Sequence, residues 1–514
     1  MNTTNKPVRR VVIAGGGTAG WMTAALMSKL LGKRLDIRLV ESEEIGTVGV
    51  GEATIPALHT FHNLLGINEA EFMAATNATF KLGINFEGWK DIGDNYFHSF
   101  GATGNDHWSA GFQHFWLKGR AEGLARTYTD YNPETVAAHA NRFAHLPRNG
   151  LNYAYHLDAG RYAKFLRAMS EGFGVNRVEG KIAAVLQDGP EGKDGDITAL
   201  LMQDGSRVEG DLFIDCTGFR SLLLGETLGV GYEDWSHWLP CDRAVAVQTA
   251  AVREAWPYTR SICHPFGWQW RIPLQHRVGN GLVYSSKELS DADAPDVLKA
   301  NVEGELLIQP RVIKFQPGQR QKVWHRNCIA IGLSSGFIEP LESTSIHLIQ
   351  RSAIRLMQLF PSNGINAADV SEFNLQCERE LMHIRDFIIL HYTVTDRSDT
   401  ALWNHVRTME LPATLRHRIE LFQESARVFR SSDELFAENS WVQVMMGQGL
   451  MPQSYHPVAD LMGRTELGQF LDDIQVRVSR TVAGLPQHQA YVEQLCAPYR
   501  QAIAERLAAA PQRA

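Results

Sequence analysis

The stretch VVIAGGGTAGWMTAALMSKLLGKRLDIRLVE, residues 11–41, decides the fold. The short apolar run VVIA is followed by glycines and then by TAGWMTAALMSKLL, in which apolar residues recur at helical spacing. DIRLVE has the composition of a second buried strand. This order predicts a βαβ unit with parallel strands, and therefore an α/β fold.

Gly15, Gly17 and Gly20 in this stretch form the pattern GxGxxG between the strand and the helix. Free backbone N–H groups and the helix dipole at that place can hold a pyrophosphate. Glu41 ends the second strand 21 residues after Gly20, where a carboxylate can accept hydrogen bonds from ribose hydroxyls. The stretch therefore predicts a dinucleotide site.

Two later segments favour FAD over NAD as the dinucleotide. DCTGFRS, residues 215–221, ends an apolar strand at Gly218, which suits a backbone passing close to the same cofactor. In TVGVGEATIP, residues 47–56, two glycines flank a valine and allow the chain to lie flat against a ligand. No second nucleotide motif that would serve NAD(P)H is visible.

Composition limits the partners and the compartment. The 514 residues are 44% hydrophobic and 21% charged with a net charge of −7, which argues against binding to nucleic acid or to an anionic membrane surface. The six cysteines are scattered without metal-ligand spacing, so reduced thiols and no metal site are expected. The polar start and the brevity of VVIA predict no signal peptide or membrane span, and hence a cytoplasmic protein.

The pattern along the chain changes near Ser352. Before it, glycine-punctuated stretches such as 83–104 predict hairpins and loops, and DLFIDCTGF, residues 211–219, predicts a buried strand. After it, SAIRLMQLF, ERELMHIRDFIILHY and LRHRIELFQESARVF carry apolar residues at helical spacing, and the alanine-rich tail is expected to fray after Pro511. We therefore expect two modules, residues 1–350 and a mainly helical 351–514.

GWQWRIP, residues 267–273, places two tryptophans one residue apart before a proline. In a strand, Trp268 and Trp270 share one face and Gln269 and Arg271 the other, so the two indoles form a wall. From the residues alone, this could be simply a hydrophobic strand ending at Pro273.

GGGTAGW, VGVGEATIP, WQWRIP and GFIEPLEST occur in this order, and with them the chain resembles the flavin-dependent halogenases of the tryptophan-halogenase type from residue 10 to about 350. WxWxIP is the specific motif, whereas related flavoproteins share the glycine motif. The resemblance implies a Rossmann-like FAD module of the GR2 flavin monooxygenase type and a mainly helical substrate module. It also implies that reduced FAD, O₂ and a halide yield hypohalous acid, which travels through a tunnel to an electron-rich aromatic ring.

The same resemblance implies a separate flavin reductase that supplies FADH₂, and it leaves a homodimer open. It makes Trp268 and Trp270 a partition that keeps the organic substrate away from the flavin. To the cofactor it assigns Gly15, Gly17, Thr18, Ala19, Gly20, Glu41, Val50, Ala53, Gly218, Leu333 and Ile346.

Lys81 lies in NATFKLGINFEGW, where Phe80, Leu82, Ile84 and Phe86 alternate with other residues as in one strand with a buried face. A lysine on the opposite face would ordinarily be solvated. The resemblance instead makes it the lysine that hydrogen-bonds hypohalous acid or forms a haloamine with it, a choice that depends on its pKa.

Glu342 and Ser343 lie in GFIEPLESTSIHLI. The resemblance assigns Glu342 to the substrate side with Ser343 beside it, where a carboxylate can stabilise the positive charge of the attacked ring and accept its proton. Without the resemblance, Glu342 could equally be an acid at the start of a helix.

The halide is expected on the backbone N–H groups of Thr344 and Ser345. The family usually has glycine where this chain has Ser345. If that position needs a positive φ, serine would be strained there, and halide handling would shift, with bromide favoured.

His98 and Phe100 match the family's His-x-Phe lining of the substrate pocket loosely, and an ordinary hairpin would explain them as well. LFAENSWVQVMMGQG, residues 435–449, lacks the paired tyrosines with which tryptophan-specific members grip the amino acid. Trp441 could stack on an indole or be a core residue. We therefore expect an indole-like or other small aromatic substrate rather than free tryptophan. The alternatives are a flavin-dependent aromatic hydroxylase and a non-catalytic FAD-fold binding or escort protein.

Overall fold

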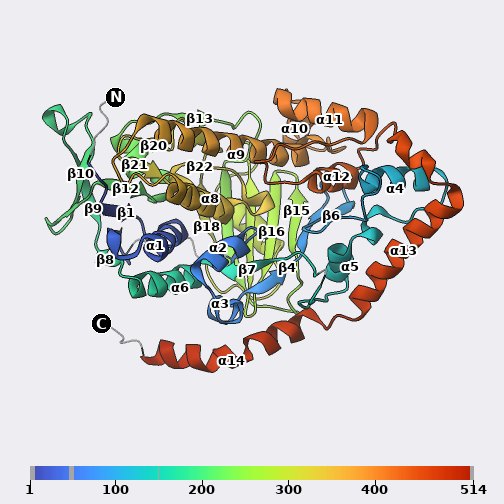
Figure 1. Ribbon diagram of the computed structural model, residues 1–514, viewed down its shortest axis with the longest axis horizontal. Helices are drawn as coiled ribbons and strands as arrows, with labels where there is room; N and C mark the ends of the chain where they lie inside the picture. Colours follow the sequence, from blue (N-terminus) through green and yellow to red (C-terminus); the bar gives the residue numbers. More distant parts are fainter. Residues whose placement is uncertain (1–5, 45–50, 149, 510–514) are drawn as a thin grey trace.

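The computed structural model describes residues 6–44, 51–148 and 150–509. Figure 1 shows a central layer of sheets with helices α8 and α9 on one side, while α13 and α14 run along the edge of the molecule. None of the helices in the described ranges is long and apolar enough to cross a bilayer.

The predicted βαβ opening is confirmed. Among the described residues it belongs to a six-stranded sheet of order β20-β21-β12-β1-β2-β8, in which β1 pairs in parallel with β2 and with β12. The apolar VVIA run is fully buried, and the helix that follows packs against α6 and α8. The bounds are β1 Arg10–Ala14, α1 Thr18–Leu31, β2 Asp36–Glu41, α6 Ala159–Gly172, β8 Asn176–Glu179, β12 Leu212–Asp215, β20 Trp324–His325, β21 Cys328–Ala330 and α8 Ser345–Gln358.

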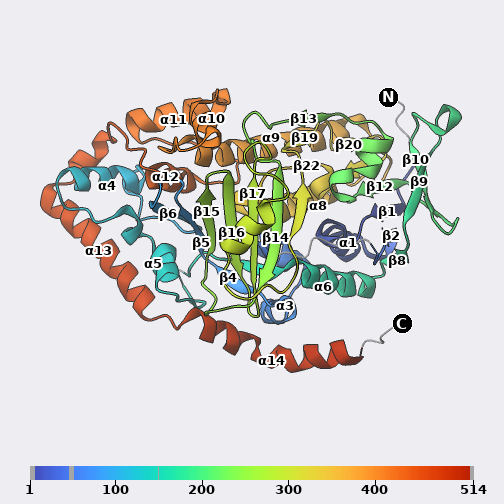
Figure 2. The ribbon, with the colours of Figure 1, turned by 180° about the vertical axis from the view of Figure 1, so that it is seen from behind.

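A second, seven-stranded sheet forms the middle of the described part of the molecule, and Figure 2 shows it from behind. Its strands, in spatial order, are β18 Arg311–Lys314, β14 Arg243–Thr249, β17 Val278–Tyr284, β16 Gly267–Pro273, β15 Thr259–His264, β5 Gly83–Glu87 and β6 Asn95–Ser99. Strand β16 carries the two tryptophans on one face, as predicted. Gln269 and Arg271 point the other way, and each donates to the backbone oxygen of Asn301.

Three small sheets complete the described β structure. They contain β3 Gly51–Ala53, β4 Thr79–Lys81 and β7 Ala154–Asp158; β9 Ile182–Gln187, β10 Ile197–Met202 and β11 Arg207–Glu209; and β13 Tyr232–Asp234, β19 Gly318–Arg320 and β22 Gly336–Phe337.

The single strand expected around Lys81 is wrong. The chain leaves one sheet after β4 and enters another at β5, because Phe80 and Leu82 pack into one hydrophobic core while Ile84 and Phe86 pack into a second. The predicted hairpin after residue 83 is present as β5–β6.

The described chain after residue 345 contains helices and no strand, as predicted. The expected module boundary at residues 350 and 351 falls inside α8, and α14 packs against α3 of the N-terminal part. The division into two modules stays a prediction. The remaining helices are α2 Leu58–Leu65, α3 Glu69–Thr76, α4 Phe112–Ala121, α5 Pro133–His139, α7 Ala294–Ala300, α9 Ala367–Thr393, α10 Ala401–Thr408, α11 Ala413–Ser425, α12 Glu438–Gly447, α13 Arg464–Ala483 and α14 His488–Ala509. Pro511 lies outside the described residues.

Candidate active site

A cavity of about 570 Å³, which we call the main cavity, opens between the N-terminus of α1, strand β16 and the N-terminus of α8. It brings together most of the residues predicted to bind the cofactor: Gly17, Thr18, Ala19, Ala53, Gly218, Leu333 and Ile346. Ser343, Ser345 and the two tryptophans line it as well. Gly15, Gly20, Glu41 and Thr344 are not part of its lining, and Val50 lies outside the described residues.

The three motif glycines have different tasks. Gly15 has a φ of 111°, and a Cβ there would lie 2.2 Å from the backbone oxygen of Cys216. A Cβ on Gly20 would lie 1.9 Å from the backbone oxygen of Gly15, whereas Gly17 has open space beside it. No side chain caps the start of α1 at Gly17, so its amides are free for a ligand. The motif therefore fits a dinucleotide pyrophosphate.

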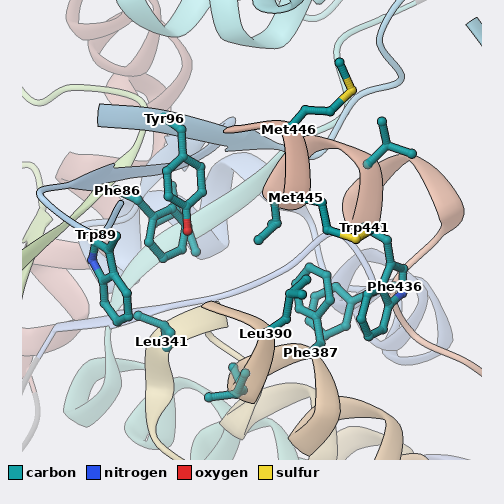
Figure 3. Close-up of a cluster of buried hydrophobic side chains, with 14 of the residues drawn as sticks. Phe86, Trp89, Tyr96, Leu341, Phe387, Leu390, Phe436, Trp441, Met445 and Met446 are labelled. Carbon is teal, nitrogen blue, oxygen red and sulfur yellow. The ribbon is translucent and has the colours of Figure 1, made fainter. Parts of the chain in front are cut away.

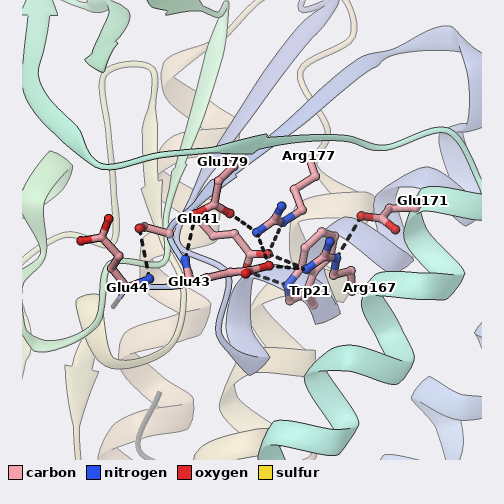
Figure 4. A network of polar contacts seen from close by, with 9 residues as sticks. Trp21, Glu41, Glu43, Glu44, Arg167, Glu171, Arg177 and Glu179 are labelled. Carbon is pink, nitrogen blue, oxygen red and sulfur yellow. Dashed lines mark hydrogen bonds and ion pairs between the residues drawn. The ribbon is translucent and has the colours of Figure 1, made fainter. Parts of the chain in front are cut away.

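Glu41 lies in a polar network at the end of β2, shown in Figure 4. Its Oε1 accepts from Arg177 Nε at 2.5 Å and from Arg167 Nη1 at 3.4 Å. Its Oε2 accepts from the indole N–H of Trp21 at 3.2 Å. One oxygen thus retains room for a further donor, and the ribose contact stays a prediction.

Lys81 ends β4 with its side chain completely buried, so the solvated alternative is wrong. Its Nζ donates to Ser343 Oγ at 2.9 Å and to the backbone oxygen of Thr54 at 3.1 Å, and it lies 5.0 Å from the ring centre of Phe100. Burial lowers the pKa of Lys81 to about 7, although the charge of Glu342 opposes this effect. Near neutral pH, the amine and the ammonium are therefore both populated.

Glu342, also fully buried, lies in the short 3₁₀ turn before α8. Both of its oxygens are 2.9 Å from Nδ1 of His98 on β6, and Oε1 is 2.8 Å from Nε2 of His391 on α9. His391 Nδ1 in turn lies 2.6 Å from the hydroxyl of Tyr96. Burial raises the pKa of Glu342, but the two imidazoles outweigh burial and bring it to about 2. The carboxylate is thus ionised and contacts histidines rather than helix amides.

The residues Lys81, His98, Glu342, Ser343 and His391 form what we call the inner cluster. Lys81 comes from β4, His98 from β6 and His391 from α9, while Glu342 and Ser343 lie in the segment that precedes α8. The fold brings these four segments together. The hydroxyl of Ser343, the residue next to Glu342, accepts from Lys81, and neither Lys81 nor Glu342 is part of the lining of the main cavity. That the amine and the carboxylate face the same space stays a prediction.

The expected strain at Ser345 is wrong. Ser345 is the first residue of α8 and is not among the residues with positive φ. The left-handed residue is Ser343, with a φ of 59°, and Thr344 has a φ of −88°. Ser345 is therefore not strained, and its backbone gives no reason to expect an altered halide preference. No side chain caps the start of α8 at Thr344, so its first amides remain free to hold an anion.

Figure 3 shows a cluster of buried side chains that includes Phe387, Phe436 and Trp441, which we call the aromatic cluster. Phe436 stacks on Phe387 with ring centres 3.8 Å apart, and Trp441 on α12 meets Phe387 edge-on at 4.8 Å. His98 lies 5.5 Å from Phe387 and 6.2 Å from Phe436. The predicted substrate-side residues His98 and Trp441 are therefore joined through these two phenylalanines.

Trp268 and Trp270 lie between the main cavity and the inner cluster. Both line the main cavity, and their ring centres are 6.1 Å apart. On its other side Trp268 meets Trp89 at 6.4 Å, and Trp89 meets His391 at 6.2 Å. The role of a partition stays a prediction.

Sequence reasoning missed three residues of this region. Glu339 contacts Trp268, Glu52 lines the main cavity, and His391 contacts Glu342. Burial raises the pKa of both Glu339 and Glu52 to about 7. Glu52 lies in the motif VGVGEATIP and Glu339 in the motif GFIEPLEST. An acidic residue within a mostly apolar motif could therefore have identified both from the sequence. His391 had none, because it lies in an ordinary helical pattern.

Comparison with known proteins is consistent with this geometry. The family model described as tryptophan halogenase matches residues 10–464. Tryptophan 6-halogenase SttH of Streptomyces toxytricini is 34% identical over 96% of this chain and 98% of that protein.

Two solved structures extend the similarity. Xcc4156, a flavin-dependent halogenase from Xanthomonas campestris, is 61% identical with a TM-score of 0.93, covering 96% of this chain and 99% of that one. BrvH, a flavin-dependent halogenase from Brevundimonas sp. BAL3, is 43% identical with a TM-score of 0.90, covering 96% and 100%.

Proposed function

The chain belongs to the tryptophan halogenase family, and we propose that Lys81 and Glu342 carry its chemistry on a small, uncharged aromatic substrate such as indole. The protein is a flavin-dependent halogenase that uses FADH₂, O₂ and a halide. The single observation that supports our residue assignment is the buried arrangement of Lys81, Ser343 and Glu342 beside the main cavity.

When bound in the main cavity, reduced FAD supplies with O₂ the oxidising equivalents that convert halide into hypohalous acid. The uncapped amides of Thr344 and Ser345 hold the halide at the start of α8, where Ser345 lines this cavity. Trp268 and Trp270 keep the aromatic substrate on the far side of the wall.

Lys81 receives the hypohalous acid and presents the halogen to the ring. Two neutral acceptors, Ser343 Oγ and the oxygen of Thr54, face its nitrogen. A neutral amine has two N–H groups for these two acceptors and keeps a lone pair free, whereas the third N–H of an ammonium would have only the ring of Phe100, 5.0 Å from Nζ, as a partner. This arrangement supports a haloamine: the lone pair of the amine attacks the halogen of hypohalous acid, an N–halogen bond forms as the O–halogen bond breaks, and the hydroxide leaves as water with one amine proton. When the ring attacks the halogen, the N–halogen electron pair returns to nitrogen, which takes up a proton again.

Glu342 stabilises the positive charge that develops on the ring, and it then accepts the ring proton. Its low pKa keeps it ionised at neutral pH, and His98 and His391 fix its carboxylate from two sides. The charge is therefore in place before the substrate reacts.

The aromatic cluster supports an uncharged substrate. The guanidinium of Arg418 lies 4.1 Å from the ring centre of Trp441, but both of its Nη atoms are bound to Glu434 at 2.9 and 2.7 Å. The side-chain amides of Asn439 and Gln443 donate to the backbone oxygen of Gly101. These groups are occupied, so they offer little to the ammonium and carboxylate of free tryptophan.

The test is mass spectrometry of indoles and phenols incubated with the enzyme, a flavin reductase, FAD, NADH, O₂ and either bromide or chloride. We expect a product heavier by one halogen, with indole turned over at least about tenfold more efficiently than tryptophan, as the loss of one charged contact implies. Efficient turnover of tryptophan would overturn the substrate assignment.

Partners and location remain predictions. We propose a separate flavin reductase, because no second nucleotide motif is present in the sequence. The homodimer and the cytoplasmic location stay predictions. All six cysteines lie in the described part of the chain and are free thiols, which is consistent with a reducing compartment.

A further inference from the structure

The two wall tryptophans differ in how their indole N–H groups are satisfied. Trp268 Nε1 donates to Oε2 of Glu339 at 2.8 Å. Trp270 Nε1 is buried and has no hydrogen-bond partner among the described residues. A buried indole with an acceptor is fixed in direction as well as in place, whereas Trp270 is held by packing, with its ring against Gly281 on the next strand.

Glu339 is itself a completely buried acid. Its Oε2 also accepts from the hydroxyl of Tyr392 at 2.6 Å, while Oε1 has no partner among the described residues. Burial raises the pKa of Glu339 to about 7, although both donors lower it. A buried carboxyl with one free oxygen costs stability, so a role other than folding would explain its presence.

The residues that hold Glu339 and Glu342 are neighbours in the sequence. His391 contacts Glu342, and Tyr392 donates to Glu339. The end of α9 therefore contacts both Glu339, the acceptor of the Trp268 indole, and Glu342, the ionised carboxylate of the inner cluster. A displacement of the indole would change the position of Glu342 through Tyr392 and His391, which are consecutive in the sequence.

We propose that Glu339 is a positioning residue whose buried carboxyl fixes the indole of Trp268 in the wall between the main cavity and the inner cluster. It acts through Trp268 and Tyr392 and does not touch the substrate. Its consequence is coupling, because a fixed wall directs the oxidised halide to Lys81, whereas a loose wall lets it escape. This inference rests on the proposed function of the wall.

The experiment uses the full chain and four variants. Glu339→Gln keeps a carbonyl oxygen that can accept from both Trp268 and Tyr392, whereas Glu339→Leu removes the acceptor at similar size. Trp268→Phe removes the donor, and Trp270→Phe is the matched control, since it shortens a wall ring without removing a hydrogen bond. FAD affinity and circular dichroism verify that each variant is folded.

The first readout is the amount of halogenated product per FADH₂ oxidised. Glu339→Leu and Trp268→Phe should lower this yield by about threefold or more, the scale of one lost buried hydrogen bond. Glu339→Gln should stay close to the parent, and Trp270→Phe, which removes no hydrogen bond, should lower the yield less than Trp268→Phe does. Equal yields for all four variants, or a Glu339→Gln yield as low as that of Glu339→Leu, would overturn the proposal.

The second readout needs no turnover. In protein labelled with ¹⁵N-tryptophan, the indole N–H resonance that disappears in Trp268→Phe should shift in Glu339→Leu, while the resonance that disappears in Trp270→Phe should not. An unshifted Trp268 resonance would overturn the contact itself. This arm remains informative even if the protein halogenates none of the compounds offered, so failure of the proposed function and failure of this inference are distinguishable.

Discussion

The main cavity and the inner cluster are neighbours, but they are built in opposite ways. The cavity is lined largely by glycines, small residues and apolar side chains, and the chain segments around it leave helix amides free for a ligand. The inner cluster consists of four ionisable side chains and the hydroxyl of Ser343, all buried and already paired with one another. A site that holds a large cofactor needs open backbone, whereas a site that performs chemistry needs side chains whose charge is set before the substrate enters.

Glu339 and Glu342 show the same contrast within one turn. Both carboxyl groups are fully buried, yet the pKa of Glu339 is raised to about 7 and that of Glu342 is lowered to about 2. The first faces an indole N–H and a hydroxyl, which are neutral donors, and the second faces two imidazoles. Burial alone therefore does not determine the charge of an acid; the partners do.

The largest expected effect is the loss of halogenation, with FADH₂ oxidation retained, when Lys81 is replaced. Lys81→Met should lower halogenation by roughly 10³-fold or more, because both the hydrogen bond and the haloamine need this nitrogen. FAD affinity and FADH₂ oxidation should stay within about twofold, since loss of one side chain outside the cofactor's contacts is near neutral for binding. Stopped-flow flavin spectra and product analysis measure the two quantities separately.

Lys118 provides a matched control for this variant. It is also a buried lysine, and its Nζ donates to the backbone oxygens of Ala459 and Met462. Lys118→Met should lower thermal stability without changing the halogenated product per FADH₂ oxidised. If Lys81→Met still halogenates, the lysine is not part of the mechanism. The inner cluster would then not be the part of the site in which Lys81 performs chemistry.

The next effect concerns the fixed charge of the inner cluster. Glu342→Gln should slow product formation by roughly 10²-fold, the scale of losing one preorganised electrostatic stabiliser. Glu69→Gln is the control, because the pKa of Glu69 is also lowered to about 2, by His145 and two tyrosines that outweigh burial, in a different part of the fold. A loss smaller than about threefold in Glu342→Gln under single-turnover conditions would favour a purely structural acid.

The sequence predicted the cavity better than the cluster. Helix α1 and strand β2 have the expected bounds because their patterns are local, and the glycine motif lies between β1 and α1 as expected. The burial of Lys81 could not be predicted, since it depends on Ser343, 262 residues away. For the same reason the break at Leu82 was missed: whether alternating residues face one core or two depends on segments that are distant in sequence.

Lys81 of the inner cluster should give halogenation a pH dependence. Because Glu52 in the main cavity also has a pKa of about 7, FADH₂ oxidation is measured alongside halogenation to separate the two contributions. With the pKa of Lys81 at about 7, the neutral amine rises about tenfold in population between pH 6 and pH 8, so halogenation through a haloamine should rise with pH by the same factor. Glu342 stays ionised throughout, because its pKa is about 2. Rate measurements at saturating FADH₂ test the sign, and a fall in rate over this range would identify the ammonium as a hydrogen-bond donor to hypohalous acid.

The smallest effect is expected at Ser343, the residue that belongs to both regions. Its hydroxyl accepts from Lys81, and it also lines the main cavity. Ser343→Ala should lower halogenation about fivefold, since one hydrogen bond contributes about 1 kcal/mol, and alanine accepts the left-handed backbone of this position about as well as serine. Loss of one acceptor should also change the pH midpoint of the halogenation rate, whereas FADH₂ oxidation should not change. If FADH₂ oxidation slowed instead, the hydroxyl would serve the cavity, and the boundary between the two regions would lie on the inner side of Ser343.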